Sequence, residues 1–396
     1  MSLARVRPHR IGISGTGYIA RGLSEQLAPM GDRYNVPIAL TRRAPDSVAP
    51  MPGVHAITAD LEQFVESCDI VVECSGSVDG ARQVAEAAIA AGRPIVTLNA
   101  EFQATIGAAF RDYPMITEAQ GDQPGSIAAL DEEVRLMGFE PVAYASQKGF
   151  LALDPSREDM EFWSGKQGIS LGAVTSFTDG TKVQIEQSLV AECLGATIAA
   201  PALLGPKAET LKEGGFALAE AADALGAPIS DYVLCPGGRG EIFIVAKHPS
   251  PPDQLRYYKL GDGPYYVIER PYHLGHLEIP VTIARMIEGR GPLMRHRRPP
   301  ETMVVAVAKR AVAAGQHMAQ AIGTFDFRGE ARLIADCADA VPIGLMEDCV
   351  LKNSVEPGQV VTWSDVELSK EASVALWRDM ITEEAARRHI LPLTRG

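Results

Sequence analysis

The chain lacks the long apolar runs and the excess of positive charge that mark several common protein classes. No hydrophobic run approaches the ~20 residues of a transmembrane helix, and no apolar signal-peptide region follows the basic start at 1–10. Its 37 Lys and Arg are outnumbered by 50 Asp and Glu, a net charge of −13 that argues against nucleic acid and anionic membranes as partners. We therefore expect a cytoplasmic protein that acts on a small molecule.

Paired cysteines are also missing. The six cysteines are scattered and form no Cys-x-x-Cys pair. A chain of 396 residues buries a large core without covalent cross-links, so we expect reduced thiols. No arrangement of Cys, His and Asp suggests an enzyme that uses a nucleophilic side chain. At about 100–200 residues per domain, the length of the chain indicates two or three domains.

The first 125 residues alternate between short apolar strands and helices. The patterns predict strands at 10–15, 36–41, 69–74 and 94–98, and helices at 18–29, 61–67 and 79–91. Alternation of this kind is typical of βαβ units around a parallel sheet. The fold class is therefore α/β, with a Rossmann domain over residues 1–125.

The rest of the chain has a looser pattern. Strands are predicted at 141–146, 242–246 and 255–260, helices at 185–199 and 209–224, a basic Pro-rich linker at 289–301, and further strands in 303–308 and 359–363. We expect an α+β substrate and catalytic domain over 126–300. A small β-rich domain with a C-terminal tail is expected over 301–396.

A glycine-rich turn joins the first strand to the first helix. Its residues are Gly15, Thr16, Gly17, Tyr18 and Ile19, followed by Ala20, which fit the G-x-G-x-x-G/A pattern of dinucleotide sites. Gly15 permits the tight turn, Gly17 lets the backbone approach the pyrophosphate, and the helix N-terminus faces it with free N–H groups.

The end of the second strand distinguishes NAD from NADP. Thr41, Arg42 and Arg43 stand where an NAD enzyme would carry an acidic residue for the ribose 2′-hydroxyl. Two guanidinium groups suit a 2′-phosphate, which favours NADP(H), although both side chains could instead be solvated. Ser75, Gly76 and Asn99 follow the next two strands and are expected to line the nicotinamide half of the site.

Reduction of a carbonyl needs a proton donor and a cation near the developing alkoxide. Lysines and carboxylates gather in three polar stretches, 118–125, 146–149 and 178–186. The candidates for catalysis are Lys148, Lys182, Asp122, Glu186 and Glu101. Surface ion pairs are the alternative interpretation of these residues.

Two histidines and a glutamate lie within 273–278. His273 and His276 could face the substrate, bind a metal together with Glu278, or be structural; the spacing is not that of H-E-x-x-H. Gln123, in the acidic stretch, is a further candidate for substrate binding. No metal ligand set can be identified from the sequence.

Several motifs together resemble a known family. They are GISGTGYIARG, VVECSGS, TLNAEFQATIG, GDQPG, VTSFTDGTKVQIEQ, YKLGDGPYY and PYHLGHLEIP. In this order they resemble the homoserine-dehydrogenase-like oxidoreductases with a C-terminal SAF domain, whose DXR-like branch converts 1-deoxy-D-xylulose 5-phosphate to 2-C-methyl-D-erythritol 4-phosphate in isoprenoid biosynthesis. The segment from 302 looks like the SAF domain.

The resemblance also implies roles for two residues. By similarity to homoserine dehydrogenases, Lys182 would donate the proton and Asp179 would help to orient it. The chain departs from those enzymes at Asn99-Ala100-Glu101, where a lysine is missing, and no ACT-like tail follows. Both differences weaken homoserine as the substrate.

These observations give three hypotheses. The preferred one is an NADPH-dependent reductase of a small polyhydroxylated, phosphorylated carbonyl compound, with a rearrangement that could use Mg²⁺ or Mn²⁺. The others are a dehydrogenase without rearrangement and a non-catalytic NADPH-binding sensor. A homodimer or higher homo-oligomer is expected in each case.

Overall fold

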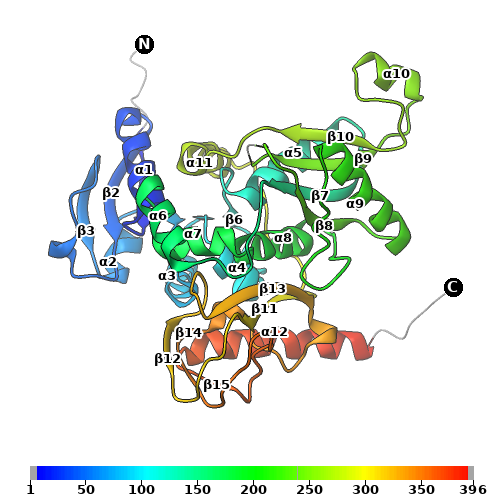
Figure 1. The fold of residues 1–396 in the computed structure, drawn as a ribbon. Helices are drawn as coiled ribbons and strands as arrows, with labels where there is room; N and C mark the ends of the chain where they lie inside the picture. The colour runs from blue at the N-terminus through cyan, green and yellow to red at the C-terminus, as the bar shows by residue number, and fades with distance from the viewer. Residues whose placement is uncertain (1–6, 239, 391–396) are drawn as a thin grey trace, which may run out of the picture. The chain divides into compact units, whose positions relative to one another are not determined.

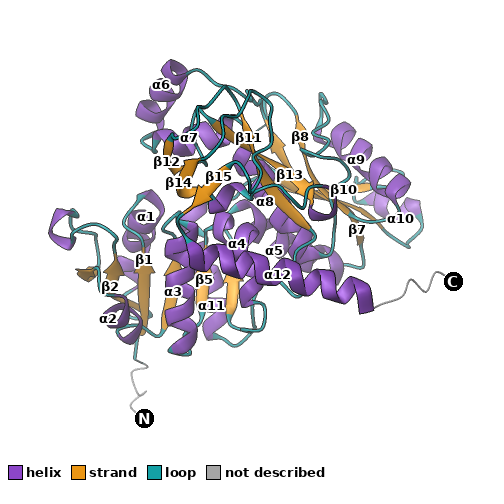
Figure 2. Ribbon diagram, turned by 90° about the horizontal axis from the view of Figure 1, so that it is seen from below, coloured by secondary structure: helices purple, strands orange, loops and turns teal. Residues whose placement is uncertain are grey.

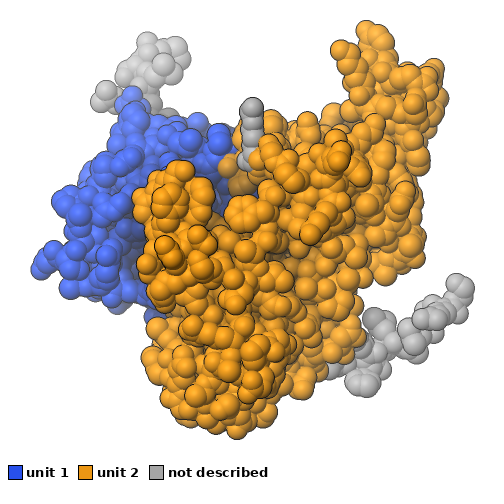
Figure 3. Space-filling view, viewed as in Figure 1, with its two compact units in different colours: residues 1–102, 112–125, 274–295 blue, residues 103–111, 126–273, 296–396 orange. Residues whose placement is uncertain are grey.

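The computed structural model describes residues 7–238 and 240–390, which form two compact units. Of the described residues, unit 1 comprises 7–102, 112–125 and 274–295, and unit 2 comprises 103–111, 126–238, 240–273 and 296–390, coloured separately in Figure 3. The predicted 126–300 domain thus contributes its residues 274–295 to unit 1. No helix within the described ranges is long and apolar enough to cross a membrane.

Unit 1 is built on a six-stranded parallel sheet, seen in part in Figure 2. Its strands are β1 (His9–Ser14), β2 (Tyr34–Leu40), β3 (Val54–Thr58), β4 (Ile70–Glu73), β5 (Ile95–Thr97) and β6 (Ile116–Glu118). They lie in the order β3-β2-β1-β4-β5-β6, the Rossmann order. The predicted Rossmann fold is confirmed.

Helices connect these strands. They include α1 (Tyr18–Leu27), α2 (Leu61–Glu66) and α3 (Val78–Ala90), with η1 (Ala28–Met30) and η2 (Pro45–Ser47) as short turns. Side-chain caps fix two of the starts, because Asp60 accepts the N–H of Gln63 and Ser77 accepts that of Gly80. The helices α4 (Ala100–Ile106) and α5 (Gln123–Leu136) begin in unit 1, and η3 (Gly107–Phe110) follows α4.

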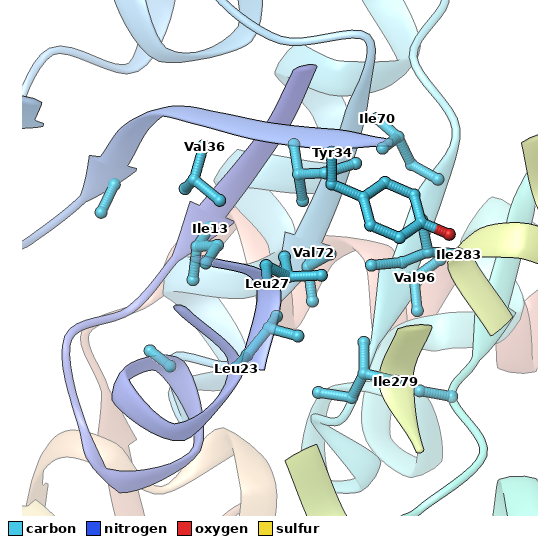
Figure 4. Close-up of a cluster of buried hydrophobic side chains, with 14 of the residues drawn as sticks. Ile13, Leu23, Leu27, Tyr34, Val36, Ile70, Val72, Val96, Ile279 and Ile283 are labelled. Carbon is cyan, nitrogen blue, oxygen red and sulfur yellow. The ribbon is translucent and has the colours of Figure 1, made fainter. Parts of the chain in front are cut away.

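The segment 274–295 completes the core of unit 1. It contains η4 (Gly275–Leu277) and α11 (Ile279–Ile287). Ile279 and Ile283 are fully buried in one cluster with Leu23 of α1 and Val96 of β5 (Figure 4). The Rossmann sheet therefore takes part of its core from residues more than 150 positions after its last strand.

Unit 2 contains a mixed four-stranded sheet in the order β10-β9-β7-β8. Its strands are β7 (Glu140–Lys148), β8 (Ile229–Leu234), β9 (Ile242–Lys247) and β10 (Tyr266–Arg270), of which β7 and β8 are parallel. Its helices are α6 (Arg157–Gln167), α7 (Leu171–Thr178), α8 (Thr181–Leu194), α9 (Leu211–Leu225) and α10 (Pro252–Tyr257). Leu218 of α9 packs on Val233 and Phe243 in the core of this sheet.

The strand predicted at 255–260 is wrong. Residues 252–257 form α10 (Figure 1), which starts with a proline at its first position, where the fixed φ favours a helix. Tyr257 and Tyr258 are largely exposed, so their aromatic character does not report a buried strand.

The rest of unit 2 is rich in short strands, as predicted. A two-stranded sheet pairs β11 (Thr302–Ala308) with β13 (Phe327–Leu333), and a three-stranded sheet joins β12 (His317–Gln320), β14 (Glu347–Leu351) and β15 (Val366–Leu368). Residues 359–363 form only isolated bridges, such as Val307 to Val360, and not the predicted strand. The chain also adds η5 (Ile334–Asp336), η6 (Ile343–Leu345) and α12 (Glu371–Ile390), a helix that the sequence analysis did not predict.

Candidate active site

A cavity of about 360 Å³ lies at the carboxyl ends of β1, β2 and β4 in unit 1. It collects most of the predicted cofactor residues. Its lining consists of Ser14, Gly15, Thr16, Gly17, Leu40, Thr41, Arg42, Arg43, Ser75, Gly80 and Val84. In open α/β sheets this edge, where the strand order reverses, is where ligands bind.

The two glycines of the motif differ in the space around them. Gly15 has φ 120°, and a Cβ there would lie 2.9 Å from the carbonyl oxygen of Cys74. Gly17 is the N-cap of α1, and a Cβ built on it would meet no atom within 4 Å. The space next to the first N–H groups of α1 is therefore open, which fits a pyrophosphate.

The two arginines stand at one end of this cavity. Arg43 donates from Nη2 to the Thr16 hydroxyl at 2.8 Å, and its backbone N–H donates to the Thr41 hydroxyl at 3.2 Å. Arg42 approaches the start of α3, where its Cδ lies 3.7 Å from a Cβ built on Gly80. Arg43 thus contacts the glycine-rich turn, and Arg42 lines the same cavity next to α3.

Glu73 is a buried acid two residues before Ser75, which lines the cavity. It ends β4, is 2% exposed, and accepts the N–H of Ser75 at 2.8 Å. Burial raises the pKa of its carboxyl group to about 7. Ser75 lines the cavity, Gly76 follows at φ 72°, and Asn99 is buried with its amide donating to the Ser77 carbonyl.

In unit 2, two lysines and a glutamate come together. Lys148 ends β7, and Lys182 and Glu186 lie one turn apart on α8. The Nζ atoms of Lys148 and Lys182 are each 3.8 Å from a different carboxylate oxygen of Glu186, which is 4% exposed. Three of the predicted catalytic residues therefore form one partly buried cluster with two cations and one anion.

Asp179 is held by a residue that the sequence analysis missed. Its Oδ2 accepts a hydrogen bond from Nζ of Lys309 at 2.8 Å, and both side chains are almost completely buried. Its Oδ1 accepts the N–H of Thr181, the first residue of α8. Asp179 thus anchors the start of the helix that carries Lys182, the residue that the resemblance implied it helps to orient.

The other predicted site residues lie on separate elements. In unit 1, Glu101 is in the first turn of α4. Asp122 forms an isolated β-bridge with Gln120, and the next residue, Gln123, starts α5. His273 belongs to unit 2 and His276 to unit 1, where its ring lies against α1. Over the described ranges, no group of three or more His, Cys, Asp or Glu could hold a metal ion.

Two family models match successive parts of the chain. The model "Homoserine dehydrogenase, NAD binding domain" matches residues 15–111, and the model "Oxidoreductase DRL, catalytic domain" matches residues 121–279. The chain is an NAD(P)-dependent oxidoreductase. The first match covers the glycine-rich turn and both arginines of the cavity, and the second covers the stretch that contains Lys148, Lys182 and Glu186.

No curated protein matches this oxidoreductase. Solved structures similar to it include a probable dehydrogenase from Thermotoga maritima, at 14% identity over 72% of this chain and 90% of that chain, with a TM-score of 0.39. A myo-inositol dehydrogenase from Corynebacterium glutamicum has 12% identity over the same shares, with a TM-score of 0.38.

Proposed function

We propose that this oxidoreductase is an NADPH-dependent reductase of a small polyhydroxylated, phosphorylated carbonyl compound. The observation that carries the proposal is the cluster of Lys148, Lys182 and Glu186, in which one buried carboxylate holds two ammonium groups at 3.8 Å. Such a cluster combines a proton donor with a second cation, the two requirements of carbonyl reduction.

The cofactor residues fit NADPH. The open N-terminus of α1 at Gly17 would bind the pyrophosphate, and Arg42 and Arg43 would bind the 2′-phosphate through charge-assisted hydrogen bonds. When bound, NADPH supplies the hydride. Both arginines line the same cavity as the glycine-rich turn, so one dinucleotide could contact all of these groups.

The lysines would act on the carbonyl oxygen. As that oxygen gains negative charge, Lys182 donates a proton to it, and Lys148 holds it by a charge-assisted hydrogen bond. Glu186 keeps both ammonium groups oriented. The polar side chains of Asp122, Gln123 and Glu101 would bind hydroxyl groups of the substrate.

The resemblance to the DXR-like branch supports a reductoisomerase, in which a skeletal rearrangement precedes reduction with a divalent cation. A second candidate is a dehydrogenase of a hydroxy acid, amino alcohol or sugar acid without rearrangement. The match of residues 15–111 to a homoserine dehydrogenase domain favours this alternative.

The test is NADPH oxidation by the purified protein against a panel of carbonyl compounds. The panel includes 1-deoxy-D-xylulose 5-phosphate and aspartate semialdehyde, each with and without Mg²⁺. Lys182→Ala is compared with Lys166→Ala, an exposed lysine on α6 whose removal should leave the rate unchanged. Metal-dependent turnover of the sugar phosphate, lost only in Lys182→Ala, supports the reductoisomerase.

Other outcomes decide against it. Turnover of another carbonyl without metal would establish the plain dehydrogenase. Binding of NADPH without turnover of any compound would favour a sensor and remove the catalytic roles given to the lysines.

A further inference from the structure

The segment 274–278 of unit 1 lies against the beginning of α1. It is held at one end by a hydrogen bond from the N–H of Gly275 to the carbonyl oxygen of Gly121, at 2.9 Å. At the other end Ile279 is fully buried in the core of unit 1. The chain between these two points forms the short helix η4 (Gly275–Leu277), so its position relative to α1 is fixed.

His276 in this segment packs directly on Gly22 of α1. A Cβ built on Gly22 would lie 2.6 Å from three carbon atoms of the imidazole ring, closer than any side chain allows. Glycine at this position is therefore required for the ring to occupy its site. Within a helix this is a costly choice of residue, since alanine favours the helix more.

The same ring meets Tyr18 edge-on. The centroids of the two rings are 5.9 Å apart and their planes are at 77°, the geometry of a favourable aromatic pair. Tyr18 is the first residue of α1 and follows Gly17, yet its side chain is 61% exposed. Because the Tyr18 side chain is so exposed, its contact with His276 is a substantial part of what holds the Tyr18 ring in place.

The segment also reaches the next residue of the motif. A Cβ built on Gly275 would lie 3.5 Å from Cδ1 of Ile19. The backbone N–H groups of Tyr18 and Ile19 belong to the first turn of α1, whose donors have no partner within the helix. Contacts with the side chains of Tyr18 and Ile19 therefore help to fix the orientation of the N–H donors that would face a pyrophosphate.

We propose that His276 is a positioning residue of the cofactor site. It holds Tyr18 and the first turn of α1 in the geometry that would bind the pyrophosphate, in place of the substrate-facing role that was one of the alternatives from the sequence. The inference rests on dinucleotide binding in the cavity of unit 1. It does not depend on the identity of the carbonyl compound or on the preference for a 2′-phosphate.

The test measures dissociation constants for NADPH and for NADH by fluorescence titration of the whole chain, without substrate. His276→Ala should weaken both by about threefold to tenfold, the range of one aromatic pair. His276→Phe keeps an aromatic ring on Tyr18 and should restore most of the binding. Gly22→Ala should weaken binding like His276→Ala, because its methyl group displaces the ring.

Gly165→Ala is the matched control. It makes the same change inside helix α6, where a Cβ would meet nothing within 4 Å, and should leave both constants unchanged. Thermal unfolding of each variant checks the fold; Gly22→Ala should remain folded because alanine favours the helix.

Unchanged dissociation constants in His276→Ala, with a raised KM for the carbonyl substrate at saturating cofactor, would overturn the inference in favour of a substrate-facing histidine. Equal losses of cofactor affinity in His276→Ala and His276→Phe would also overturn it, because an aromatic ring at position 276 would then not be what supports binding. A wild-type preference for NADH would refute the proposed NADPH specificity and leave this inference standing.

Discussion

The buried pair of Asp179 and Lys309 allows a sharp test of how unit 2 is held together. The two side chains are 0% and 1% exposed, and their charged atoms are 2.8 Å apart. Replacing Lys309 by Met leaves the Asp179 carboxylate buried, with the N–H of Thr181 still donating to it but no cation beside it. Breaking a buried pair in this way costs about 3–5 kcal/mol, because the desolvation penalty of the remaining charge is no longer offset.

The assay is urea unfolding at pH 7 of Lys309→Met, Asp179→Asn and the double variant. The double variant removes both charges, while the amide oxygen that Asp179→Asn introduces can still accept the N–H of Thr181, so most of the lost free energy of unfolding should return. Lys247→Met is the control. It breaks an ion pair of similar length, 2.7 Å to Asp223, whose side chains are about 40% exposed, and should cost no more than about 1 kcal/mol.

Two results would refute this reasoning. Equal losses in Lys309→Met and Lys247→Met would mean that burial does not set the cost of the pair. A double variant as unstable as the sum of the single ones would mean that the two side chains do not act on each other. Because Thr181 starts α8, we also expect Lys309→Met to lower kcat through Lys182.

Three further predictions concern unit 1. Arg43→Ala should weaken NADPH binding by about 1.5–3 kcal/mol and leave NADH binding unchanged; equal losses would remove its role at the 2′-phosphate. Gly15→Ala places a side chain at φ 120° and 2.9 Å from the Cys74 carbonyl, so we expect a loss of about 1–3 kcal/mol in thermal unfolding and weaker cofactor binding; wild-type values would contradict the strain. Burial raises the pKa of Glu73 from 4.5 to about 7. The stability that the protonated carboxyl group contributes is therefore fully present below about pH 4.5 and is lost as the pH rises through 7. Glu73→Gln should therefore gain up to about 3 kcal/mol relative to wild type between pH 4.5 and 8, and a difference that does not change with pH would contradict this.

Local spacing explains what could be predicted from the sequence. Gly15 and Gly17 sit between a strand and a helix that are both visible as patterns, and Lys182 and Glu186 are one helical turn apart. Arg42 and Arg43 follow a predicted strand end, so their place at the cavity follows from parallel-sheet topology alone. For such residues, the position in the sequence is enough to predict the position in the fold.

Contacts between distant residues could not be predicted in this way. Lys309 is 130 positions from Asp179, and no sequence pattern links the two residues. His276 stood in a conspicuous cluster of two histidines and a glutamate, yet the ring lies over Gly22, and only the absence of a side chain there hinted at close packing. The tyrosines at 257–258 illustrate the reverse, since an aromatic pattern typical of strands belongs to an exposed helical end.

The return of residues 274–295 to unit 1 limits how the enzyme could be recombined with others. A fragment ending near residue 125 would carry all six Rossmann strands but would lack Ile279 and Ile283, each fully buried in their core. Two such side chains contribute roughly 3–6 kcal/mol, a large part of the stability of a small domain. A cofactor domain exchanged between relatives of this chain must therefore be transferred as at least two pieces, and a chimaera joined at a single crossover point would inherit a core with mismatched halves.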